Sequence, residues 1–249
     1  MDRCTPQQRH LRALLALGWF NSDLDTVRGR WCAYGLTSYT LLPSPTDGEL
    51  RIWTNWAEGA VRWLVPGGDE WPFRIPGLRL EATDGRIWRL RHLPTQAVLT
   101  VVEGSGRGRR RPAQWVDPQW IRPTTAALTD VEADQLGAVP AMTSAASELL
   151  AALPVRMALR DPRGEWAIGG WWGDPLDRPQ QRSVTQALRR LDGAGDRWEL
   201  AWTGYPFPDD LAIALSHPTV GLSDTHRQRT RTGWDIHHNG AVLTLRSLE

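Results

Sequence analysis

Apolar residues recur at helical spacing near the start of the chain and again around its middle. Thr5 and Pro6 have the pattern of an N-cap and a first helical position, and an amphipathic run of leucines follows them. A second helix is predicted from about Ser22. Thr129 and Thr143 precede two further short helical patterns, and the first of these has the Thr-x-x-Glu spacing of a capping box.

Short alternating or apolar runs, which are typical of β-strands, fill other parts of the chain. Residues 61–102 are punctuated by Pro-Gly and Asp-Gly and predict a meander of strands. Farther on, the pattern predicts a strand at 164–172, a helix at 180–191 and a strand at 197–205, an order that permits a βαβ or α+β unit. Residues 50–56 form a third short apolar element of the N-terminal part. The sequence shows no convincing internal repeat.

The C-terminal segment predicts a β-hairpin. Asn239-Gly240 stands between two strand-like runs, which is the strongest short-range hairpin pattern. A two-residue turn would pair His238 with Ala241. The alternation of side chains then places two sets on opposite faces: Trp234, Ile236, Leu243 and Leu245 on one, and Asp235, His237, Val242 and Thr244 on the other.

Together these elements predict an α+β protein with two domains. Residues 1–60 are expected to form a small helical module. Residues 61–249 are expected to form a larger, Trp-rich domain of mixed or antiparallel β-structure with a few helices and a basic loop at 104–112. A chain of 249 residues is long enough to bury a full core in either arrangement.

Composition excludes several classes of protein. The net charge is +1, so no global field attracts nucleic acid or acidic lipid, although all 29 basic residues are arginine. Cys4 and Cys32 are too few for a disulfide framework. No segment has the length of a membrane span. The first residues lack the pattern of a cleavable signal peptide, which predicts a cytoplasmic location or release to the cell wall by another route.

Fifteen tryptophans, against three tyrosines and three phenylalanines, are a marked excess. Most are expected to be core anchors, and some to form a stacking surface for sugars or bases. Arg107, Arg109, Arg110 and Arg111 lie in a glycine-rich loop just before Trp115, a combination that would neutralise phosphates and stack on a base. A solvated loop is the alternative explanation, and the sequence leaves both open.

A second cluster near the C-terminus has the spacing of a metal site. His217 and Asp224 are seven positions apart, and Asp235 lies three before His238. These elements resemble those of zinc D-alanyl-D-alanine carboxypeptidases, in which His, Asp and His hold zinc and an acid is the base. The resemblance implies His217 and Asp224 as ligands and Asp235 as the base. The hairpin places His238 on the face opposite Asp235, so His237, which shares the face of Asp235, is expected as the third ligand. The two elements lie closer together than in that family.

The N-terminal quarter contains a further pattern. Gly18, Trp19, Phe20 and Asn21 would form a turn, Asp25 lies in a loop before Gly29, and Tyr39 and Trp53 follow at later elements. This order resembles the three-helix peptidoglycan-binding domain, although Thr40 stands where that domain has glutamine. The resemblance implies a trihelical module with four binding residues: Trp19, Asp25, Tyr39 and Trp53.

Three function classes follow from these patterns. The first is a peptidoglycan-binding protein of the cell wall, either non-catalytic or a metal-dependent or carboxylate-based wall hydrolase of the phage-lysis type. The second is an accessory protein that binds nucleic acid through Arg107–Arg111. The third is a protein-interaction or immunity module without catalysis.

Overall fold

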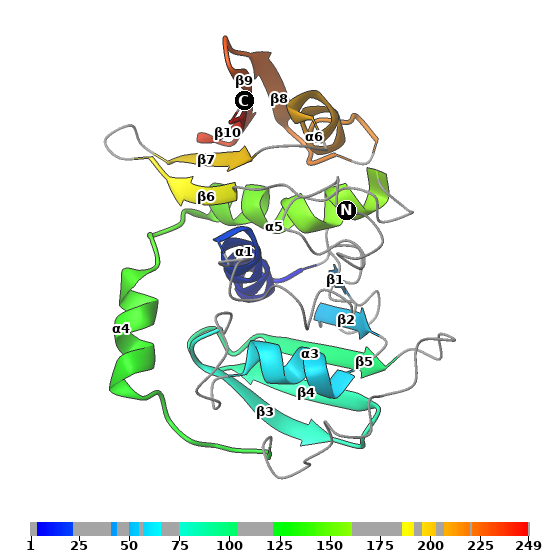
Figure 1. Cartoon of the computed structure of the whole chain (residues 1–249), viewed down its shortest axis with the longest axis vertical. Coiled ribbons are helices and arrows are strands. Elements are labelled where there is room, and N and C mark those ends of the chain that lie inside the picture. The colour runs from blue at the N-terminus through cyan, green and yellow to red at the C-terminus, as the bar shows by residue number, and fades with distance from the viewer. Residues whose placement is uncertain are drawn as a thin grey trace. The chain divides into compact units, whose positions relative to one another are not determined.

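Two five-stranded sheets organise the chain, which is an α+β protein (Figure 1). The computed structural model describes residues 4–21, 41–43, 50–54, 57–65, 75–103, 122–160, 186–191, 196–202, 207–219 and 221–248. These divide into two compact units, formed mainly by Thr40–Val139 and Pro140–Glu249. Within helix α1 (Pro6–Asn21), residues up to Leu11 group with the first unit and residues from Arg12 with the second.

The first unit contains a mixed sheet in the order β1-β2-β5-β4-β3. Strands β2 and β5 are parallel, and the other neighbours are antiparallel. Helix α3 packs against β2, β4 and β5. The elements in chain order are α1 Pro6–Asn21, β1 Leu41–Pro43, β2 Leu50–Thr54, α3 Ala57–Leu64, β3 Leu78–Thr83, β4 Ile87–His92, β5 Val98–Glu103 and α4 Asp130–Ala138.

The second unit contains a sheet in the order β6-β7-β10-β9-β8. Here β7 and β10 are parallel and the other neighbours are antiparallel. Helices α5 and α6 pack against each other and against β9 and β10. The elements are α5 Ser144–Arg160, β6 Gln186–Arg190, β7 Arg197–Trp202, α6 Pro208–Leu215, β8 Thr225–Arg229, β9 Gly233–His238 and β10 Ala241–Ser247.

The two units have the same topology, which the sequence analysis missed. Among the described elements, each sheet is formed by two strands, a helix and then three strands, and in each the second strand lies parallel beside the last. The last two strands also share a sequence pattern, Trp-x-aliphatic-x-His, a turn, and Ala-Val-Leu-Thr. Leu99 faces Leu90, and Leu243 faces Ile236, so the registers agree as well. The described sheets are therefore two copies of one structural arrangement.

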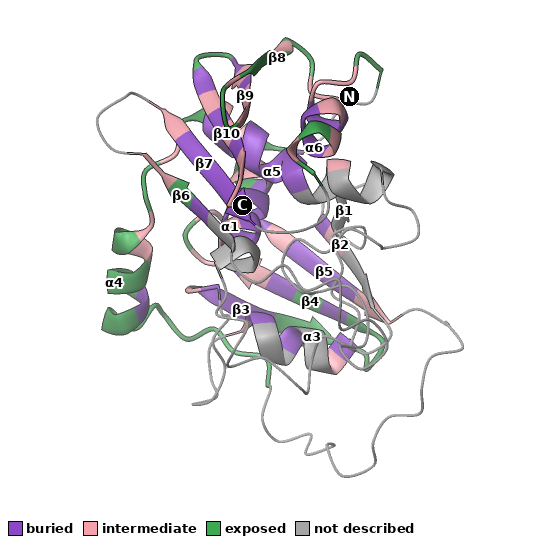
Figure 2. Cartoon of the chain, turned by 45° about the horizontal axis from the view of Figure 1, so that its top comes forward, coloured by how far each residue is buried: buried purple, intermediate pink, exposed green. Residues whose placement is uncertain are grey.

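Each unit has its own apolar core. In the first sheet Leu50, Leu80, Leu90 and Leu99 are fully buried, and in the second Trp198, Leu200, Ile236, Leu243 and Leu245 are buried to a similar degree. Figure 2 shows these buried positions in purple along both sheets. None of the helices in the described ranges is long and apolar enough to span a membrane.

Several local predictions are confirmed. The C-terminal hairpin has the expected register, His238 opposite Ala241, and both turn residues have positive φ, 45° at Asn239 and 88° at Gly240. This is the conformation that a two-residue hairpin turn requires. The capping box at Thr129 is present. The meander predicted within 61–102 corresponds to β3, β4 and β5.

Two predicted elements are wrong in type. Gln186–Arg190, expected to be helical within 180–191, is strand β6, because Leu188 pairs with Leu200 of β7 and is buried while Arg189 is exposed. Leu50–Thr54, where the peptidoglycan-binding resemblance implies a third helix, is strand β2 and pairs with β5.

The predicted domain boundary after residue 60 falls within helix α3. The second helix predicted from Ser22 and the strand predicted at 164–172 lie outside the described residues.

Candidate binding edge at strand β8

Strand β8 is the last described strand of the second sheet, where its described neighbour is the antiparallel strand β9. The hairpin between them is closed by a hydrogen bond from Thr230 N to Gly233 O at 2.9 Å. In an antiparallel ladder the hydrogen-bonded pairs alternate, so the next pair inward, Arg229 with Trp234, is not hydrogen-bonded. The backbone N–H and C=O groups of Thr225, Arg227 and Arg229 therefore point away from β9. No described residue bonds to them.

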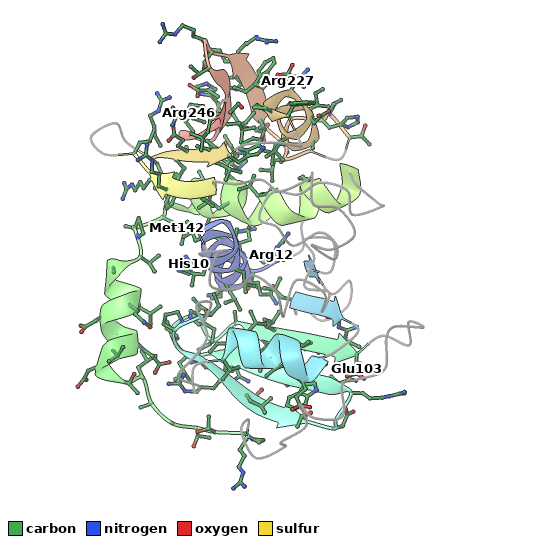
Figure 3. The ribbon with its side chains drawn as sticks, viewed as in Figure 1. His10, Arg12, Glu103, Met142, Arg227 and Arg246 are labelled. Carbon is green, nitrogen blue, oxygen red and sulfur yellow. The ribbon has the colours of Figure 1, made fainter. Side chains whose placement is uncertain are left out.

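A groove runs between β8 and helix α6. It encloses about 280 Å³. Figure 3 labels Arg227 beside α6, and both elements contribute to the groove walls. The lining residues are Ile213, Ser216, His217, Pro218, Thr225, His226 and Arg227. An exposed strand edge thus lies directly beside a cavity.

Basic side chains are concentrated on this strand and its turn: His226, Arg227, Arg229 and Arg231, all of them exposed. The guanidinium carbons of Arg227 and Arg229 lie 5.4 and 5.5 Å from the centre of the Trp234 ring, within the range of a cation–π interaction. Arg229 is also 3.7 Å from Asp209, which accepts a hydrogen bond from Trp234 Nε1 at 2.6 Å. Arg227 forms no ion pair with any described carboxylate.

A buried histidine supports the start of β8. The ring of His238 lies between two polar groups, with Nε2 2.7 Å from Glu148 Oε2 and Nδ1 3.2 Å from Thr225 Oγ1. A hydroxyl, an imidazole and a carboxylate in this order are also the groups used in nucleophilic catalysis. His238, however, is only 3% exposed, which leaves little access for a substrate.

The first unit shows what this histidine does. His92 occupies the equivalent position, is fully buried, and places Nε2 3.2 Å from Pro76 O and Nδ1 2.8 Å from Thr95 Oγ1. A carbonyl and a carboxylate both accept hydrogen bonds, so Nε2 carries the hydrogen in both units. Burial lowers the pKa of His92 to about 4, which keeps it neutral. We conclude that the histidine anchors the hairpin in both units and has a structural role.

The corresponding strand edge of the first unit is covered by the chain itself. Leu80 of β3 is equivalent to Arg227 of β8, since they face Leu90 and Ile236. The carbonyl of Leu80 accepts a hydrogen bond from Thr124 N at 2.9 Å. Beyond Thr124 the segment 125–129 continues alongside β3 to helix α4 (Figure 1).

The side chain of Arg79 holds this covering segment in place. Its Nε and Nη2 atoms donate to the carbonyls of Ala126 and Ala127 at 3.2 and 2.9 Å. Both of its Nη atoms also bond to Glu132 of α4 at 2.6 Å. The first unit thus contains an extended segment at the edge that, in the second unit, no described segment covers.

The structure does not form the predicted zinc site. Within the described ranges, no group of three or more His, Cys, Asp or Glu residues could hold a metal ion. His217 Nδ1 accepts a hydrogen bond from Thr219 N at 3.2 Å, and the His237 ring stacks on His226 at 4.6 Å. Asp224 has a φ of 57° in the turn before β8.

Asp235, the predicted base, has a structural environment instead. It forms an ion pair with Arg197 at 2.9 Å and accepts a hydrogen bond from Thr244 Oγ1 at 2.7 Å. Thr244 lies on the neighbouring strand β10, and Arg197 lies on β7, one strand farther on. Asp235 therefore links β7, β9 and β10.

The other predicted binding residues are only partly placed. Trp19 lies in helix α1 and Trp53 in strand β2. The remaining ones lie outside the described residues: Asp25, Tyr39, Arg107, Arg109, Arg110, Arg111 and Trp115. The β8 edge was not among the predicted sites, although "THRQRTRTG", with alternating basic residues before a Trp, indicates it in the sequence.

The described geometry defines a class of protein, a two-unit α+β protein with an open, basic sheet edge on its second unit. Comparison of the chain with family models, with curated proteins and with solved structures found no match.

Proposed function

We propose that the chain is a protein-interaction module that binds an extended segment of a partner protein at strand β8. In such strand addition, main-chain hydrogen bonds supply much of the affinity and neighbouring pockets supply the specificity. The outward groups of Thr225, Arg227 and Arg229 would supply the hydrogen bonds. The groove between β8 and α6 would supply the pocket.

The observation that carries this proposal is the difference between the two equivalent edges. In the first unit the chain's own segment covers β3 and bonds to Leu80. Strand β3 also has a bulge between Leu80 and Ala82, a feature that protects sheet edges. Strand β8 has a regular register over Thr225–Arg229 and no described cover. Among the described residues, the second unit thus keeps the edge geometry and has no segment bound along it.

Basic residues on an edge strand also prevent unwanted pairing. Two copies of β8 pairing with each other would bring the arginines of one chain against those of the other, which is unfavourable. The same charges do not oppose a neutral or acidic segment. They therefore disfavour a homodimer through this edge and favour a different partner.

The experiment that tests the proposal is Arg227→Pro. Proline is tolerated on an edge strand where its missing N–H faces solvent, so the ladder with β9 should persist. Peptides selected by the full-length protein from a random display library would be synthesised with a dye and measured by fluorescence anisotropy. We expect Arg227→Pro to weaken their binding at least about tenfold, equivalent to about 1.4 kcal/mol.

The matched control is Arg231→Gln, which removes a nearby positive charge in the turn and leaves every edge N–H intact. It should retain most of the affinity, and circular dichroism should show both variants folded. If the library yields no binding peptide, or if the selected peptides bind Arg227→Pro as tightly as the unmodified protein, the proposal is wrong.

A further inference from the structure

The groove beside β8 has a one-sided distribution of charge. Of the seven residues that line it, Arg227 carries a permanent positive charge, and two others are the histidines His217 and His226. None of the seven is a carboxylate. Asp209 of α6 is 56% exposed and interacts with Arg229 and Trp234 outside this lining.

No described carboxylate pairs with Arg227 in the groove. Its guanidinium lies over the Trp234 ring, and it has no ion pair among the described residues. An arginine offers five N–H donors in a fork that matches a carboxylate. The cation–π contact with Trp234 leaves the edge of that fork available for an incoming acceptor.

Strand geometry determines which residue of a bound segment would meet this arginine. When a strand is added to a sheet edge, the residues directly opposite each other have their side chains on the same face. The side chain of Arg227 lies on the face that borders α6, the same face as Ile236 and Trp234. The residue opposite Arg227 would therefore project into the groove.

We infer that the partner segment carries an aspartate or glutamate at the position opposite Arg227, and that this carboxylate enters the groove between β8 and α6. This inference rests on the proposed strand addition. The carboxylate would pair with the Arg227 guanidinium and approach His217 on the opposite wall. A hydrogen-bonded ion pair in a partly enclosed groove is stronger than one on an open surface.

A peptide fits this site better than a nucleic-acid phosphate does. The β8 edge presents N–H donors and C=O acceptors in alternation, which complements another extended backbone. A phosphate backbone has acceptors only, so the outward carbonyls of Thr225, Arg227 and Arg229 would repel it. The observations therefore favour an acidic protein segment.

Two dye-labelled pools of degenerate nonapeptides would test the inference by fluorescence anisotropy. They differ in one respect, since the central residue is Glu in one pool and Gln in the other. At about 50 mM salt we expect the Glu pool to bind the full-length protein about tenfold more tightly, with the difference falling to about twofold at about 0.5 M salt. In Arg227→Gln, which keeps the backbone N–H, the two pools should bind equally.

The outcomes separate the two proposals. Equal binding of both pools by the unmodified protein, abolished by Arg227→Pro, would overturn the acidic preference and support strand addition. Absence of binding by either pool would overturn both. Displacement of the Glu pool by a single-stranded oligothymidylate, with binding that depends on Arg227, would identify nucleic acid as the ligand and also overturn the inference.

Discussion

Replacing Glu132 by glutamine is expected to lower the free energy of unfolding of the first unit by about 3 kcal/mol at neutral pH. The carboxylate is buried and accepts hydrogen bonds from both Nη atoms of Arg79, from Gly77 N at 2.9 Å and from Thr129 N at 3.0 Å. Glutamine would leave the guanidinium of Arg79, with a side chain only 7% exposed, without its counter-charge. The loss would loosen helix α4 and the segment that covers β3.

The same contact predicts how stability depends on pH. The hydrogen bonds from Arg79 lower the pKa of Glu132 from 4.5 to about 2. Because the folded-state pKa is depressed, the stabilisation is present above about pH 4.5 and is lost as the pH falls toward 2, an effect of about 3 kcal/mol. His92, with its pKa lowered by burial from 6.5 to about 4, adds a loss at higher pH, between about 6.5 and 4.

Urea unfolding at several pH values, followed by circular dichroism, measures both effects. Glu132→Gln should remove the loss of stability below about pH 4.5 and keep the loss assigned to His92. The control is Glu81→Gln, since Glu81 bonds to Arg89 and Arg91 on the exposed surface and its side chain is 37% accessible. That variant should change stability by no more than about 1 kcal/mol. Equal effects of the two substitutions would contradict our account of the Arg79–Glu132 pair.

Features encoded within a few residues could be predicted from the sequence. Asn239 and Gly240 tolerate positive φ, and this property alone determines the turn and hence the pairing of β9 with β10. The cap at Thr129 is equally local, because its hydroxyl and the Glu132 carboxylate satisfy each other's backbone donors three residues apart.

Features that depend on distant partners could not be predicted in the same way. Leu50–Thr54 and Gln186–Arg190 are too short for their periodicity to separate strand from helix, and their partners β5 and β7 decide the outcome. The similarity of the two units could not be predicted from the sequence because the spacing of their matching residues differs. The histidine and the Ala-Val-Leu-Thr run are separated by four residues in the first unit and by two in the second, so a search at fixed spacing does not align them.

The candidate binding edge at β8 is also a feature that depends on distant parts of the chain. An alternating basic run indicates a half-exposed strand, but nothing in "THRQR" states that it is the last strand of its sheet. That property arises because the chain turns back into β9 and adds no further described strand beside β8. The contrast with β3 depends on Thr124, which is far from Leu80 in sequence. Only the folded structure brings these observations together.

The duplication predicts that Leu99→Ala and Leu243→Ala each destabilise one unit by about 3 kcal/mol. Both leucines are fully buried, and each is the third residue of an Ala-Val-Leu-Thr run. Each pairs with a parallel strand on one side and with an antiparallel strand on the other. Removing three side-chain carbons leaves a cavity at the centre of the corresponding sheet. The two substitutions should therefore have similar costs in different parts of the chain.

Hydrogen exchange followed by mass spectrometry measures where each substitution acts. Leu99→Ala should accelerate exchange in β3, β4 and β5, whereas Leu243→Ala should accelerate it in β8, β9 and β10. The preceding valines, Val98 and Val242, are only partly buried and supply matched controls, whose alanine variants should cost about 1 kcal/mol or less. Equal acceleration in both sheets from one leucine variant would mean that the units unfold together. Acceleration that stays within the sheet carrying the substitution would mean that each unit has its own core and unfolds independently of the other.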